Sequence, residues 1–108
     1  MAYDEGLAIR IEECLADQPF RTRKMFGGLC FLVNGNMCCG IVGDTLMARV
    51  GPDQYADCLT QPFAREMTFT GKAMKGMIYV DPEGIVEDED LRRWLERCFR
   101  FVQRLPPK

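Results

Sequence analysis

Apolar residues follow one another almost without interruption along two neighbouring segments, Leu29–Val33 and Met37–Val42. Between them, Asn34-Gly35 supplies residue types that tolerate the positive φ angles of a two-residue hairpin turn. The pattern predicts two antiparallel strands joined by a tight turn. Because nearly every residue of both strands is apolar, we expect both faces of the hairpin to be covered and the hairpin to lie inside a small sheet.

Two segments have the spacing of amphipathic helices. The first is predicted over Asp4–Asp17, because Asp4 is a favourable N-cap and Gln18-Pro19 stops a helix. Its apolar stripe consists of Leu7, Ile11, Cys14 and Leu15. The last helix begins at the acidic run Glu87–Asp90, which suits the positive end of the helix dipole. Its stripe consists of Leu91, Trp94, Leu95, Cys98, Phe101, Val102 and Leu105.

Three more segments are predicted to be strands. In Thr45–Val50, apolar residues alternate with Thr45, Met47 and Arg49, which indicates that these three lie on a wet face. Gly51-Pro52-Asp53 then opens a short helix. Met67–Thr70 and Met77–Val80 follow as two further strands, and residues 71–76 are predicted to connect them as a turn and lead-in.

The basic segment Arg21–Lys24 is predicted to be a first strand or its approach. The paired Gly27-Gly28 indicates a bulge, or a place where another backbone comes close. The chain therefore predicts an α+β fold in the order α-β-β-β-α-β-β-α, with a mainly antiparallel five-stranded sheet packed against helices. At 108 residues, we expect residues 1–108 to form a single domain.

Composition then narrows the classes of function. The net charge of −2 gives no global attraction to nucleic acid or to anionic membranes. No apolar run approaches the ~20 residues of a membrane span, and the acidic N-terminus is not a signal peptide. We therefore expect a cytoplasmic protein. The chain contains no His and no Ser, which removes Ser–His and Cys–His pairs and every zinc site with an imidazole ligand.

The six cysteines have two readings. A secreted protein of this size would use them as a disulfide framework, whereas a cytosolic one would bury them as small apolar side chains. Cys38-Cys39 is the candidate for redox or metal chemistry. Since adjacent residues of a strand point to opposite faces and no Cys-x-x-Cys occurs, we expect packing instead. The acidic run 83–90 lacks the ligand order of a calcium loop, so no metal or other cofactor is expected.

Basic residues form two groups. The last helix carries Arg92, Arg93, Arg97, Arg100 and Arg104, and the second group is Arg21, Arg23 and Lys24. If the two groups met on one face, they would bind phosphates despite the net negative charge. Otherwise the arginines are the solvated side of a helix.

Several blocks of this sequence resemble one known family. They are Lys24-Met25-Phe26-Gly27-Gly28, Val33-Asn34-Gly35-Asn36-Met37 and Leu46-Met47-Ala48-Arg49-Val50-Gly51, followed by Phe69-Thr70-Gly71-Lys72, Met74-Lys75-Gly76, Tyr79-Val80, and Leu91 with Trp94. In this order they resemble the N-terminal domain of the TfoX/Sxy family. The resemblance implies an α+β fold with a five-stranded sheet and three helices. It also implies a role without catalysis, since the family supplies no catalytic residues.

Two-domain members of that family regulate natural competence, and are thought to act in transcription through protein partners. This chain ends at Pro106-Pro107-Lys108, so we expect a stand-alone domain. The leading hypothesis is an interaction module that binds another protein. Its two candidate surfaces are the segment Lys24, Met25, Phe26, Gly27 and Gly28, and the face formed by Arg92, Arg93, Arg97, Arg100 and Arg104. The alternatives are a nucleic-acid-binding domain that uses the last helix with Arg21, Arg23 and Lys24, and thiol or metal chemistry. A homodimer stays open.

Overall fold

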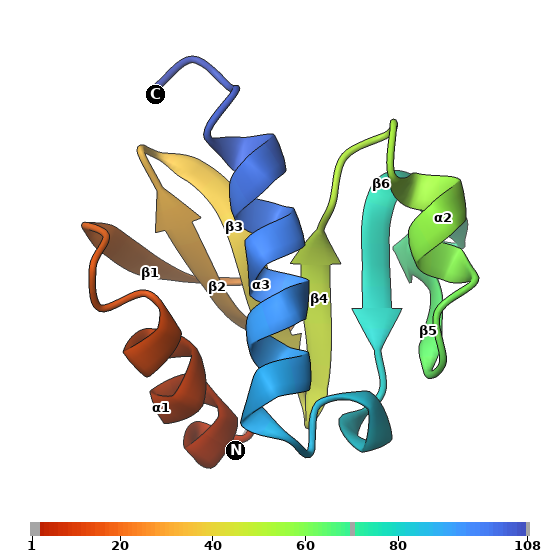
Figure 1. The fold of residues 1–108 in the computed structure, drawn as a ribbon, viewed down its shortest axis with the longest axis horizontal. Helices are drawn as coiled ribbons and strands as arrows, with labels where there is room; N and C mark the ends of the chain where they lie inside the picture. The colour runs from red at the N-terminus through yellow and green to blue at the C-terminus, as the bar shows by residue number, and fades with distance from the viewer. Residues whose placement is uncertain (1–2, 70, 108) are drawn as a thin grey trace.

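The computed structural model describes residues 3–69 and 71–107. The strands form one antiparallel sheet in the order β1-β2-β3-β4-β6-β5. Their bounds are β1 Phe20–Met25, β2 Gly28–Val33, β3 Asn36–Val42, β4 Thr45–Arg49, β5 Ala64–Phe69 and β6 Lys72–Val80. Figure 1 shows this sheet behind a layer of helices. The α+β class and the antiparallel pairing are confirmed.

The sheet has six strands, so the prediction of five is wrong. The strand left out of that count is β1, which contains the segment Arg21–Lys24 predicted as a first strand or its approach. It pairs with β2 along its whole length, from Phe20 opposite Val33 to Met25 opposite Gly28. Its four central residues are polar and exposed, so no apolar alternation marks it as a strand. Backbone hydrogen bonds to β2 hold it in place, and its position at the edge of the sheet leaves these four side chains in water.

The predicted hairpin is confirmed as β2 and β3. Asn34 and Gly35 have φ angles of 56° and 80°, as a two-residue turn of this kind requires. Both strands lie inside the sheet, since β2 is flanked by β1 and β3 lies beside β4. The register between them shifts at Phe31/Leu32, which leaves Cys38 as an extra residue in β3.

The later strands are longer than predicted. β5 begins at Ala64 and β6 begins at Lys72, so most of the segment expected as a turn belongs to β6. Thr70, the predicted end of the strand Met67–Thr70, lies outside the described residues. Apolar and polar side chains do not alternate at the start of β6. The strand bends at Gly76, whose φ angle is 93°.

The helices are α1 Glu5–Cys14, α2 Tyr55–Leu59 and α3 Asp88–Val102, with a 3₁₀ turn at Pro82–Gly84. Asp4 caps α1 as predicted and accepts hydrogen bonds from the backbone N–H groups of Gly6 and Leu7. α1 ends at Cys14, earlier than the predicted Asp17, because the fully buried Leu15 already leaves helical geometry. No helix among the described residues is long and apolar enough to cross a membrane.

All three helices pack on one face of the sheet, where the larger apolar cluster lies (Figure 1). The fully buried members of α1, α3 and the strands meet there, among them Ile11, Leu46 and Leu95. The stripe predicted for the last helix is confirmed for its central residues. No described helix lies on the other face of the hairpin, where Cys30 is buried but Leu32 and Met37 are partly exposed. The expectation that both faces are covered is therefore met only in part.

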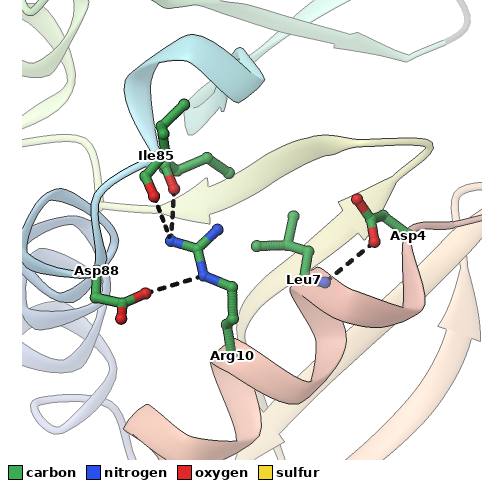
Figure 2. A network of polar contacts seen from close by, with 6 residues as sticks. Asp4, Leu7, Arg10, Ile85 and Asp88 are labelled. Carbon is green, nitrogen blue, oxygen red and sulfur yellow. Dashed lines mark hydrogen bonds and ion pairs between the residues drawn. The ribbon is translucent and has the colours of Figure 1, made fainter.

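Arg10 joins α1 to the start of α3 (Figure 2). Its Nη2 donates to the carbonyl oxygens of Ile85 and Val86 at 2.6 and 3.2 Å, and its Nε contacts Asp88 Oδ1 at 3.1 Å. One guanidinium thus satisfies two backbone carbonyls and a carboxylate. These contacts link α1 to the segment that leads into α3.

Candidate functional site

The predicted surface Lys24–Gly28 forms the junction between β1 and β2. Its first two residues end β1, and Phe26 and Gly27 turn the chain with φ angles of 56° and 75°. A Cβ atom on Gly28 would lie 1.8 Å from the carbonyl oxygen of Ile41 on β3. The predicted close backbone approach is therefore confirmed. The alternative of a bulge here is wrong, because β1 and β2 pair in regular register up to this turn.

The sheet face opposite the helices carries a second apolar cluster, which we call the methionine face. Its buried members are Cys30, Met47, Met67 and Met77, and around them pack the partly buried Met25, Phe26, Leu32, Met37, Val42, Met74 and Tyr79. Six of the seven methionines in the chain lie on this face. Met47 was predicted on a wet face but is 0% exposed. Flexible thioether side chains from neighbouring strands fill the space that a helix would otherwise fill.

A cavity of about 400 Å³ lies beside the methionine face, and we call it the methionine pocket. Its apolar walls are Phe26, Met37, Met74, Met77 and Phe101. The ring of Phe101, near the end of α3, lies against the backbone of Gly51. A Cβ atom on that glycine would fall 2.3 Å from the ring. Glycine at this position therefore lets α3 form one wall of the pocket.

Two cations, Arg49 and Lys75, also line the methionine pocket. Arg49 is half-buried, and its Nη1 donates to the backbone oxygen of Met37 at 3.2 Å. Its guanidinium carbon lies 5.4 Å from the centre of the Phe101 ring. Within the described part of the chain, neither cation forms an ion pair with a carboxylate. The pocket therefore combines apolar walls with uncompensated positive charge.

A second cavity, of about 380 Å³, contains three of the predicted arginines, and we call it the arginine hollow. Its lining is Val50, Gln54, Arg97, Arg100, Phe101 and Arg104. Phe101 thus forms a wall of both cavities, and Arg104 lies 6.0 Å from its ring centre. Arg97 is partly neutralised, since Asp57 lies 3.4 Å away.

The five arginines of the last helix do not form one surface. Arg93 pairs with Glu89 at 2.7 Å and with Asp90 at 3.6 Å. Arg92 instead lines a separate hollow between α1 and α3, which also contains Cys14. The three members of the arginine hollow lie together because they recur every three or four residues along one side of α3 and of the turn that follows it. Arg93 and Arg97 also line a further hollow, beside Trp94.

The other basic group lies away from α3. Arg21 and Arg23 pair across from Leu32 and Cys30, which belong to the methionine face. Directly paired residues point to the same side of a sheet, so these two arginines lie on the face opposite the helices. The condition under which the two basic groups would bind phosphates together, a shared face, is therefore not met by Arg21 and Arg23.

The prediction that Cys38 and Cys39 point to opposite faces is also wrong. The extra residue in β3 turns both side chains into the helix-side core, where the thiol of Cys38 contacts those of Cys39 and Cys98. Hydrogen bonds with these two thiols, with help from the charge of Arg49, lower the pKa of Cys38, whereas its burial opposes this shift. The hydrogen bond with Cys38 and burial raise the pKa values of Cys39 and Cys98.

All six cysteines are free thiols, and all except Cys14 are buried. Their role as small apolar core residues is confirmed for those five. Within residues 3–69 and 71–107, no group of metal-ligating side chains is arranged to hold an ion.

The prediction of the site missed Arg49, Lys75 and Phe101, although it named Phe26. Arg49 was placed on a wet strand face and Phe101 in the apolar stripe of the last helix. A charged residue that interrupts an apolar strand is the signal that would have marked Arg49. The position of Lys75 depends on the bend of β6 at Gly76, which no periodicity indicates.

These observations define a small α+β domain. Its helices lie on one face of an antiparallel sheet, and an apolar, cationic site lies at the end of the opposite face. The family model described as the TfoX N-terminal domain matches residues 12–102. The chain belongs to this family, which is associated with the regulation of competence. Comparison with curated proteins and with solved structures gave no match.

Proposed function

We propose that this domain is a non-enzymatic interaction module of the cytoplasm, which binds a protein partner and takes part in competence and transcriptional regulation. The observation that carries the proposal is the methionine face with its pocket, which no described helix covers. Family membership supports the regulatory setting, because the family is associated with competence.

Methionine-rich apolar surfaces are suited to binding proteins. A thioether side chain is flexible and polarisable, so it adapts to the shape of a partner side chain. Apolar surface that a domain leaves without a covering element commonly marks an interaction site. Aromatic residues at the wall of a pocket, here Phe26 and Phe101, are typical anchors of such interfaces.

The test is recovery of a partner by the tagged protein from its native cells. In Met74→Lys, a cation replaces one wall of the methionine pocket, and we expect the partner to be lost. The control is Ala73→Lys, which adds the same charge at the neighbouring exposed residue outside the pocket. Equal thermal unfolding of both variants shows that folding is intact. The proposal is contradicted if the protein recovers no stoichiometric partner, or if Met74→Lys recovers as much partner as the unchanged protein.

A second candidate function is direct nucleic-acid binding, which the arginine hollow favours. It predicts that duplex or single-stranded probes bind with an affinity that falls steeply with salt, by a log–log slope of about −0.9 per phosphate contacted on a duplex. Replacement of Arg100 and Arg104 by Ala is then expected to reduce that slope. Flat binding curves at low salt with both kinds of probe remove this candidate.

A further inference from the structure

We propose that the methionine pocket and the arginine hollow together bind an acidic segment of a partner protein that carries one large apolar anchor residue. This inference rests on the proposed function and adds the chemistry of the partner. The anchor fills the methionine pocket, and the acidic residues on either side of it meet the cations around Phe101.

The two cavities are joined through one aromatic side chain. Phe101 lines both, and the guanidinium carbons of Arg49 and Arg104 lie 5.4 and 6.0 Å from its ring centre. The contact of its ring with Gly51 fixes this wall. A ligand that enters the pocket therefore lies next to the arginines of the hollow.

The charge of this region is complementary to an anion. Arg49, Lys75, Arg100 and Arg104 line the two cavities, and within the described part of the chain none of the four has a carboxylate partner. Among the described residues that line the two cavities, none is acidic, although the chain as a whole has a net charge of −2. Carboxylates of a partner would form the charge-assisted hydrogen bonds that these cations lack.

The shape of the region favours an extended peptide over a small molecule. The unpaired cations are distributed over two cavities of about 400 and 380 Å³, on two sides of Phe101. A ligand that satisfies them all has to span both, whereas a compact ligand fills only one. A nucleic-acid strand would meet the cations but has no aliphatic or sulfur-containing group to match thioether walls. A peptide with an apolar anchor matches both parts.

The experiment is selection of a random linear-peptide display library on the immobilised wild-type protein. We expect the enriched peptides to be strongly acidic and to contain at least one large apolar residue. Their affinities are then measured for three variants. Arg100→Glu/Arg104→Glu reverses the charge of the hollow, and Met74→Lys blocks the pocket. The matched control, Arg92→Glu/Arg93→Glu, makes the same change in charge on α3, outside both cavities.

The expected result is binding at least about tenfold weaker for the hollow and pocket variants and unchanged for the control. Enrichment of neutral or basic peptides, or full binding by Arg100→Glu/Arg104→Glu, overturns the inference. The proposed function survives that result if binding still depends on Met74. If no peptide is enriched, both the inference and the proposed function fail. An oligonucleotide is tested as a competitor of the peptides. If it displaces them and its own binding requires Arg100 and Arg104, the inference is overturned in favour of nucleic acid. Thermal unfolding of each variant verifies its fold.

Discussion

Two adjacent glycines, Gly27 and Gly28, meet different constraints. Gly27 has a φ angle of 75° with open space around its missing side chain, whereas Gly28 needs a bare backbone because Ile41 O lies where its Cβ would be. We expect Gly28→Ala to lower the free energy of unfolding by about 3 kcal/mol or more, since the β2–β3 pairing has to separate. Denaturant titration measures this loss.

Gly27→Ala is the matched control for that substitution. Gly27→Ala adds only the strain of a positive φ angle, so we expect the free energy of unfolding to fall by about 1 kcal/mol. Equal losses for the two variants would show that backbone conformation, and not the close approach to β3, explains the glycine pair.

Cys14 is the one cysteine that is not fully inside the core. Burial raises the pKa of its thiol; the charge of Arg92 opposes this shift and that of Asp88 adds to it. Because the thiolate is the nucleophile, the raised pKa slows alkylation relative to the unfolded chain at pH values up to the ordinary thiol value of 9.0. The rate is expected to keep rising with pH above that value. Iodoacetamide labelling followed by mass spectrometry checks this pH profile.

The same labelling counts the accessible thiols. One site is expected to react in the native protein and the remaining five only after unfolding, and Cys14→Ala is expected to abolish the native reaction. Rapid labelling of Cys38 would contradict the buried three-thiol contact. That contact itself was not predictable from residue spacing, because one extra residue in β3 reverses the direction of a single side chain.

At the scale of elements, Arg10 is the polar link between α1 and the start of α3 (Figure 2). Arg10→Met keeps the apolar stem of the side chain but leaves two backbone carbonyls and Asp88 without their donor. We expect the free energy of unfolding to fall by about 1–3 kcal/mol. Chemical denaturation measures the change.

Arg93→Met provides the comparison for Arg10. Arg93 pairs with Glu89 on the same helix, and both side chains are well exposed, at 65% and 72%. Exposed pairs of this kind contribute about 0.5 kcal/mol or less. If Arg93→Met costs as much as Arg10→Met, the link between the helices does not explain the role of Arg10.

Elements also differed in how far the sequence predicted them. The β2–β3 hairpin and α3 followed from patterns that are local to the chain: Asn34-Gly35 in one case and a long apolar stripe in the other. β1 and the start of β6 did not, because backbone pairing with a neighbouring strand stabilises them and their side chains carry no alternation.

At the scale of the whole molecule, the order of strands predicts how stability is distributed. β1 and β5 each pair with one neighbour, whereas β2, β3, β4 and β6 pair on both sides. Backbone N–H groups of the four inner strands are expected to exchange hydrogen most slowly, and those of β1 and β5 fastest among the strands. Hydrogen exchange measured by NMR checks this order. Equal protection of β1 and β3 would contradict it.

The sequence by itself determined the α+β class, the central hairpin, the cap of α1, the apolar stripe of the last helix and the burial of most thiols. These features depend on residue type and spacing along a short stretch of chain. The packing of the chain was needed to establish that the helices cover one face, that the arginines in and after α3 divide, and that Phe101 joins the methionine pocket to the arginine hollow. Those features depend on the order of the strands, on one extra residue in β3 and on the bend at Gly76. Each of these sets the direction of side chains on strands and helices that are distant in the sequence, so short stretches of sequence do not reveal it.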